Sequence, residues 1–114
     1  MDESDEQRTT LVLTDVRDED GTMWRAIKLT EDGGLAIVGH DYGTGVERVF
    51  GCKEYEFERR LSASEVATLR QLLAIPTDDG LLAAVGSRFP STHELESFTE
   101  EHGIAGQMWN WIGD

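Results

Sequence analysis

The stretch from Gly39 to Leu61 constrains the fold most, because its second half alternates between acidic and other side chains. Residues 54–61 read Glu-Tyr-Glu-Phe-Glu-Arg-Arg-Leu, and a period of two is typical of a strand with one buried face and one solvated face. We expect the residues of one face to point into a core: Tyr55, Phe57 and Leu61. The opposite face would carry a glutamate ladder, with side chains about 7 Å apart along the strand, formed by Glu54, Glu56 and Glu58.

Three further runs upstream of this strand also predict β-structure. They are rich in β-branched and apolar residues and cover residues 9–16, 22–29 and 35–42. The Asp-Gly pair at positions 20–21 and the Gly-Gly pair at 33–34 separate them, and such pairs favour tight hairpin turns. These three runs therefore predict an antiparallel meander, which a glycine loop connects to a fourth strand at residues 52–61.

After Leu61 the apolar spacing changes from two to that of a helix. Ser62 with Glu65 and Ser91 with Glu94 have the spacing of capping boxes, so we expect a helix to begin at each serine. Pro76 would end the first of these helices, and Thr77 or Asp78 would cap a short helix between them. Residues 104–112 are short and aromatic, which fits a last strand or an extended segment on the sheet.

Strands followed by helices predict the α+β class, here an antiparallel sheet of four to five strands with two to three helices packed on one face. At 114 residues the chain has room for a single domain. We expect this domain to cover residues 9–114, after an acidic disordered tail at residues 1–8.

The charge balance limits the possible partners. Ten Lys and Arg residues face 23 Asp and Glu residues, a net charge of -13, which disfavours nucleic acid and anionic membranes and attracts basic proteins. The single cysteine, Cys52, cannot form an internal disulfide, and the N-terminal residues lack the pattern of a signal peptide. The expected location is the cytoplasm.

Motifs that would indicate catalysis or a cofactor are weak. The glycines at 43–45 begin like a dinucleotide fingerprint, but Arg48 stands where its third glycine belongs. His40, His93 and His102 are scattered, and Cys52 offers one thiol, so the sequence predicts no catalytic residue, metal or cofactor. A small metal-dependent enzyme that uses His40 with Asp41 is the alternative.

Several segments resemble a group of small uncharacterised acidic proteins of actinobacteria. The resemblance covers nearly the whole chain after the acidic tail and is carried by residues 39–43, 54–57, 88–89, 95–96, 102–104 and 109–114. It implies no particular activity. In size and acidity the chain is also similar to immunity proteins that neutralise basic nuclease toxins, a similarity of physical type without a shared motif.

The sequence therefore favours a binding or inhibitor protein over an enzyme, and the narrower hypothesis is an immunity-like protein that contacts a basic toxin or nuclease. The predicted partner-binding residues are Asp41, Tyr42, Glu54, Glu56, Glu58, Trp109 and Trp111. For the two tryptophans we favour closure of the core, since each can bury about 200 Å²; exposed, they would be anchors beside an acidic rim. A structural homodimer formed through a sheet edge or these tryptophans is a third possibility.

Overall fold

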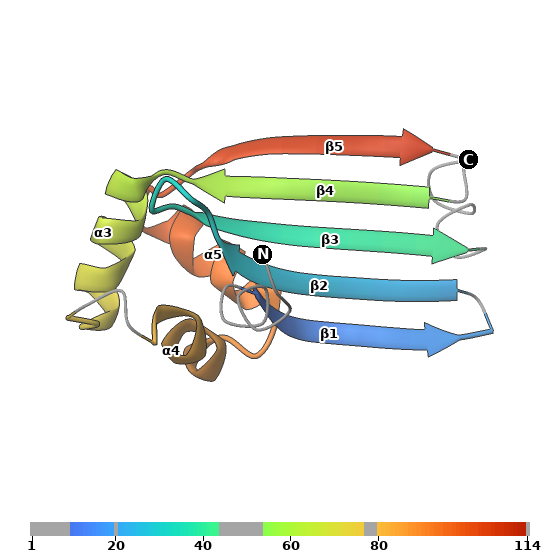
Figure 1. The fold of residues 1–114 in the computed structure, drawn as a ribbon, viewed down its shortest axis with the longest axis horizontal. Helices are drawn as coiled ribbons and strands as arrows, with labels where there is room; N and C mark the ends of the chain where they lie inside the picture. Colours follow the sequence, from blue (N-terminus) through green and yellow to red (C-terminus); the bar gives the residue numbers. More distant parts are fainter. Residues whose placement is uncertain (1–9, 20, 44–53, 77–79, 114) are drawn as a thin grey trace.

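The computed structural model describes residues 10–19, 21–43, 54–76 and 80–113 of the chain. One antiparallel sheet contains five strands, whose order in space follows their order in the sequence (Figure 1). The strands are β1 (Thr10–Asp18), β2 (Gly21–Leu29), β3 (Leu35–Gly43), β4 (Glu54–Leu61) and β5 (Gln107–Gly113). Between β4 and β5 lie the helices α3 (Ala63–Leu73), α4 (Leu81–Arg88) and α5 (Thr92–Glu101). The predicted α+β class is confirmed.

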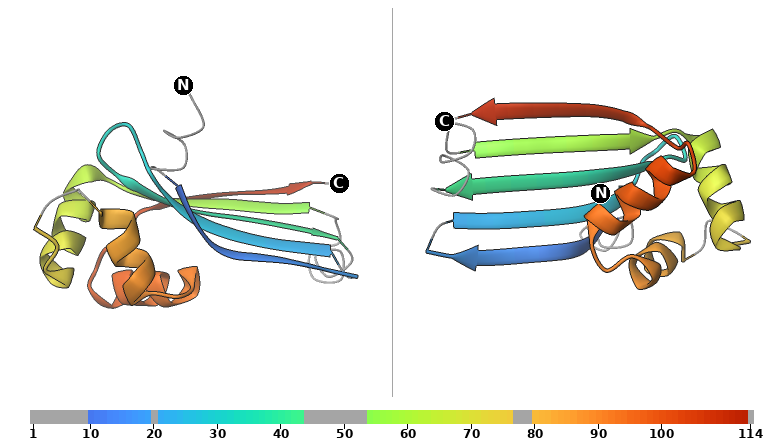
Figure 2. Two further views of the ribbon diagram at one scale, coloured as in Figure 1. Left: turned by 60° about the horizontal axis from the view of Figure 1, so that its bottom comes forward. Right: turned by 180° about the vertical axis from the view of Figure 1, so that it is seen from behind.

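The three helices gather at one end of the sheet and on one of its faces (Figure 2). Helix α3 contacts β4, α4 contacts β1 and β2, and α5 contacts β2. We call the side that they cover the helix face and the opposite side of the sheet the open face. Because the helices cover only one end, the other end of the sheet extends beyond them (Figure 2).

The core lies between the helix face and the helices. Ile27, Ile37 and Leu61 contribute to it from β2, β3 and β4, and each is at most 2% exposed. The helices contribute equally buried side chains, among them Leu69, Leu81, Val85 and Leu95. Leu11 of β1 packs close to α4, where a Cβ atom on Gly86 would lie 2.4 Å from its Cδ2 atom.

The alternation predicted for residues 54–61 is present in β4. Leu61 is buried, and Phe57 is partly buried against the core. Tyr55 shares their face but is only half-buried, because it lies further along β4 from Leu61, toward the end of the sheet that the helices leave uncovered. The ladder glutamates lie on the open face, opposite residues of β3 and β5 that also point there.

The helix starts agree with the sequence in two of three cases. Ser62 and Glu65 form the complete capping box: the Glu65 amide donates to Ser62 Oγ, and the Ser62 amide donates to the Glu65 carboxylate. Ser91 accepts from the Glu94 amide. Helix α4 instead begins after Gly80, which adopts a left-handed conformation at the N-cap, so the prediction of a Thr77 or Asp78 cap is wrong.

Some sequence predictions lie outside the described residues. These are the acidic tail, the glycine loop after Gly43, and Cys52. Within the described ranges, none of the helices combines the length and apolar character needed to cross a membrane.

Candidate functional site

The register of the sheet brings two tryptophans, a histidine and a glutamate into one row on the open face. Trp24, His40, Glu56 and Trp111 are successive cross-strand partners on β2, β3, β4 and β5. Neighbouring strands lie about 4.8 Å apart, so each side chain of the row contacts or faces the next. The next row toward the helices, also on the open face, contains Ala26, Val38, Glu58 and Trp109.

An open groove of about 1190 Å³ lies over these rows. The residues that line it include Val38, Gly39, Trp24, Lys28 and Trp111. The turn that joins β2 to β3 curls up beside the sheet and contributes further lining residues, namely Thr30 and Glu31 (Figure 2). The groove is therefore a hollow of the sheet face, bounded by aromatic and charged side chains.

The tryptophans of β5 do not close the core. Trp109 is 45% exposed and Trp111 is 60% exposed, and both lie on the open face, opposite Glu58 and Glu56. The prediction that they complete the core is wrong, because the helices cover the other face and leave β5 at the sheet edge. With Trp24, all three tryptophans of the chain lie on the open face.

The glutamate ladder divides into two parts with different partners. Glu58 pairs with Arg60 at 2.8 Å and with Lys28 at 3.8 Å, and its side chain is only 18% exposed. The guanidinium of Arg60 also lies 5.7 Å from the Trp109 ring centroid. Two basic residues of the same face thus already compensate the Glu58 charge.

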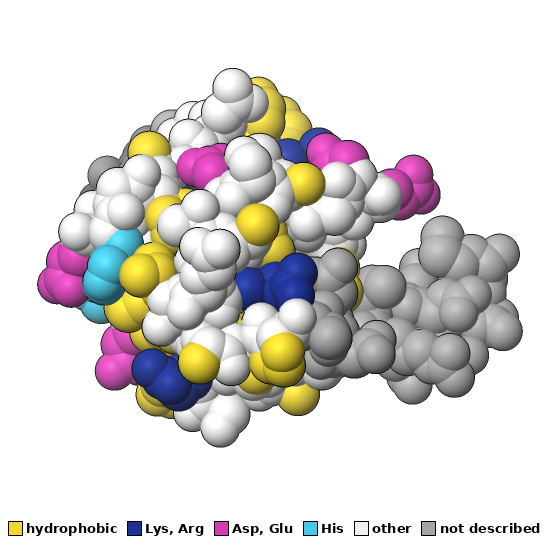
Figure 3. Space-filling model, turned by 90° about the vertical axis from the view of Figure 1, so that its left-hand side faces the viewer, with side chains coloured by type: hydrophobic (Ala, Val, Ile, Leu, Met, Phe, Trp, Pro, Cys, Tyr) yellow, Lys and Arg dark blue, Asp and Glu magenta, His cyan; other side chains and the backbone are white. Residues whose placement is uncertain are grey.

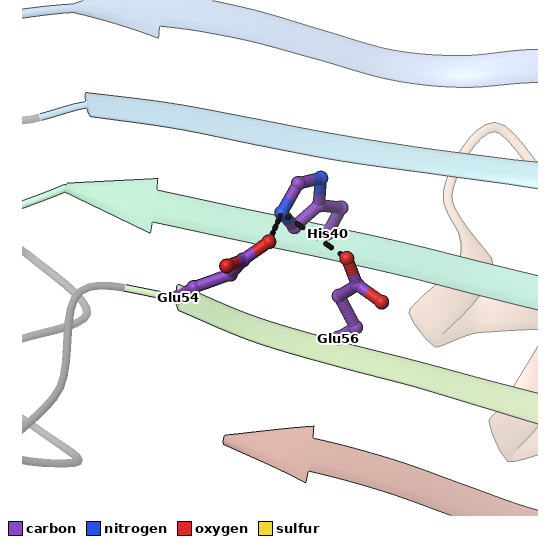
Figure 4. A group of neighbouring side chains, drawn as sticks. All are labelled: His40, Glu54 and Glu56. Atoms are coloured by element: carbon purple, nitrogen blue, oxygen red, sulfur yellow. Dashed lines mark hydrogen bonds and ion pairs between the residues drawn. The ribbon is translucent and has the colours of Figure 1, made fainter. Parts of the chain in front are cut away.

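The other two glutamates of the ladder surround a histidine. His40 Nε2 lies 2.9 Å from Oε1 of Glu54 and 3.5 Å from Oε1 of Glu56 (Figure 4). One ligand atom from each residue falls within 4.8 Å of the others. The three side chains are each about 40% exposed, so solvent and solutes reach them.

Asp41 is separated from this cluster by the pleat of its strand. Its carboxylate accepts two hydrogen bonds from Arg25 on the helix face, at 2.6 and 2.9 Å. His40 points to the opposite face, so the alternative in which His40 and Asp41 act together in one site is wrong. Asp41 likewise does not share a surface with the other predicted partner-binding residues.

The remaining predicted residue, Tyr42, is 50% exposed on the open face, one position beyond His40 on that side. Sequence reasoning missed several groove residues of the same face, among them Trp24, Lys28 and Val38. The sequence does contain a signal for Trp24. A tight turn joins residues 29 and 35, and pairing the two strands outward from this turn places Trp24 opposite His40.

The helical end has a different surface character. Figure 3 shows Lys and Arg side chains between scattered acidic ones there, mixed with small apolar patches. The described chain thus defines an α+β protein with one helix-covered sheet face and one open face that combines tryptophans, glutamates and a histidine. Comparison with family models, curated proteins and solved structures finds no match to this chain.

Proposed function

We propose that this protein is a binding module that takes a basic segment of another protein onto the open face of its sheet. The observation that carries the proposal is the exposure of Trp109 and Trp111 beside the glutamate ladder. Exposed tryptophans are the side chains most enriched in binding hot spots, and their ring faces attract the cations of Arg and Lys. A groove between such rings and carboxylates suits a basic, extended segment.

Charge supports a basic partner. The chain carries a net charge of -13, which would speed the association of a positively charged protein at low salt. Within the site, Glu54 and Glu56 are the carboxylates that a partner would reach, because Lys28 and Arg60 already pair with Glu58. We therefore assign most of the charge recognition to Glu54 and Glu56, and the apolar contact to Trp111.

A labelled peptide of alternating Lys, Arg and small residues tests the proposal by fluorescence anisotropy. Binding should also change the intrinsic emission, since every tryptophan of the chain lies on the open face. Trp111→Ala and Glu56→Gln should each weaken binding about tenfold, the size of effect that loss of a hot-spot contact produces. An acidic peptide of equal length should not bind.

Glu101→Gln is the matched control. It removes one negative charge from an exposed position at the end of α5, away from the open face. Equal weakening by Glu56→Gln and Glu101→Gln would mean that the peptide senses only net charge, and the proposal would fail. If the tryptophan emission of the protein without peptide changes on dilution, and light scattering shows a dimer, the open face instead binds a second copy of the chain.

The narrower form of the proposal is an immunity-like role, in which the basic partner is a toxin or nuclease. Small size, high acidity and an exposed acidic and aromatic face support it. The test is inhibition: a basic nuclease encoded beside this chain should lose its activity in a 1:1 complex and regain it with the Trp111→Ala variant. A complex that leaves the nuclease active would restrict the role to binding.

A further inference from the structure

We propose that His40, Glu54 and Glu56 form a binding site for a divalent first-row metal ion, of which Zn²⁺ and Mn²⁺ are the best candidates. The inference goes beyond the binding of a basic partner, because it concerns a property of this chain alone. Its starting point is the convergence of one imidazole nitrogen and two carboxylate oxygens on one point of the open face (Figure 4).

The spacing of these atoms suits a metal ion. Zinc lies about 2.0–2.2 Å from nitrogen and oxygen ligands, so two ligands of one ion stand roughly 3–3.5 Å apart. His40 Nε2 lies 2.9 Å from the Glu54 oxygen and 3.5 Å from the Glu56 oxygen. All three ligand atoms lie within 4.8 Å of one another, so side-chain rotations that bring them to about 3–3.5 Å would complete the site.

The strands hold the three residues in position. His40 and Glu56 are direct register partners on β3 and β4, and Glu54 is two residues from Glu56 on the same side of β4. Ligands on paired strands are held more firmly than ligands on loops. The backbone therefore keeps the three residues side by side on the open face, and the rotamers of the two glutamates bring their oxygens to His40 Nε2.

The donor set indicates which ions fit. One imidazole with two carboxylates suits Zn²⁺, Mn²⁺ and similar ions, whereas Ca²⁺ prefers six to eight oxygen ligands. Two carboxylates would neutralise the ion's charge. Glu58 is less suited to bind a metal ion, because Lys28 and Arg60 already compensate its carboxylate. The only ion pair of Glu56 in the described chain is with His40, a second potential ligand.

The site opens toward the groove. His40 and Glu56 line it, between Trp24 and Trp111 of the same row. Three protein ligands leave at least one coordination position of the ion for water or for an oxygen donor that enters the groove. The flanking tryptophans make the site observable, because a paramagnetic ion bound there would quench their emission.

Isothermal titration of the full chain with ZnCl₂ and with MnCl₂ tests the proposal, with CaCl₂ for comparison. We expect one equivalent of Zn²⁺ to bind and Ca²⁺ to bind at least tenfold more weakly. His40→Ala and Glu56→Gln should each reduce Zn²⁺ affinity tenfold or more. The control variants Glu101→Gln and His102→Ala should leave it unchanged, since both residues lie outside the cluster, at the end of α5 on the helical side.

Two measurements on the wild-type protein test the proposal even if the variants do not fold. Zn²⁺ should shift the NMR signals of the His40 ring and leave those of His93 and His102 in place. Co²⁺ should quench tryptophan emission and give visible absorption bands of a coordinated ion. Absence of binding at millimolar Zn²⁺, or shifts confined to the other histidines, would overturn the proposal.

Peptide binding measured in the presence of a chelator separates this proposal from the proposed function. If the peptide binds but Zn²⁺ does not, only the metal site is overturned. If Zn²⁺ binds but the peptide does not, only the proposed function is overturned. If both exist, Zn²⁺ should weaken peptide binding several-fold, because the ion neutralises the two carboxylates that the peptide needs.

Discussion

The aromatic ring of Phe57 lies over Gly39, its direct register partner on the neighbouring strand. A Cβ atom at position 39 would lie 2.1 Å from Cε1 of Phe57, far inside contact distance. The Arg25 guanidinium lies 5.0 Å from the centroid of the same ring. Glycine at position 39 is therefore what allows Phe57 to pack flat on β3 and to reach the core from β4.

Gly39→Ala should destabilise the protein. The added methyl group must displace the Phe57 ring, and overpacking of this kind costs about 1–3 kcal/mol in the free energy of unfolding. Urea denaturation measures it. In a Phe57→Leu background the same substitution should cost clearly less, since the smaller side chain can yield; an equal cost in both backgrounds would show that the ring is not the obstacle.

Asp41→Asn should lower stability and leave peptide binding unchanged. The Arg25 and Asp41 side chains are 18% and 21% exposed, so the change leaves a partly buried guanidinium short of a charged partner, at a cost of roughly 1–3 kcal/mol. Asp15→Asn is the matched control, because its pair with Arg17 is well exposed and should contribute less than about 1 kcal/mol. If the folded Asp41→Asn variant binds the peptide more weakly than wild type, the conclusion that Asp41 lies outside the binding surface is contradicted.

The stability contribution of Glu65 should depend on pH. Hydrogen bonds from the backbone amides of Ser62 and Gly106 lower the pKa of Glu65 below its usual 4.5, against partial burial. A lowered pKa means that the ionised carboxylate stabilises the fold above pH 4.5 and that this stabilisation is lost as the pH falls through the folded-state pKa. Glu65→Gln should therefore cost about 0.5–1.5 kcal/mol at pH 7 and progressively less as the pH falls below 4.5. Gln71→Ala on the same helix should show no such dependence on pH.

Glu96 should behave in the opposite way. Burial raises the pKa of Glu96 above its usual 4.5, although Arg59 at 3.6 Å opposes the shift. Its favourable contribution is therefore complete below pH 4.5 and is lost as the pH rises through the raised pKa. Relative to wild type, Glu96→Gln should gain stability between pH 4 and pH 7 in thermal melts; a variant that loses stability over this range would contradict the assignment.

Local sequence signals predicted most of the elements correctly. The turns near residues 20 and 33 place the strands, and the serine caps with the helical spacing after Leu61 place α3 and α5. These features depend on neighbours a few residues apart, which is why a linear pattern records them. The Gly80 start of α4 was missed because a glycine N-cap leaves no side-chain signature.

The site could be predicted only in part, because it depends on cross-strand register. His40 and Asp41 are adjacent in sequence but point to opposite faces, whereas His40 and Glu54 meet although 14 residues separate them. The register between β3 and β4 sets that meeting, and no periodicity encodes it. The exposure of Trp109 and Trp111 depended in the same way on which face the helices cover.

Strand β5 has a consequence for the order in which the protein is made. It pairs only with β4, yet the three helices separate the two strands in sequence, so it is the last described element to leave the ribosome. Every residue of the core cluster, from Ile27 to Ile104, precedes β5 in the sequence. Trp109 and Trp111 are therefore added after the residues that form the core, and a partner that needs these side chains recognises only chains whose synthesis has passed residue 111.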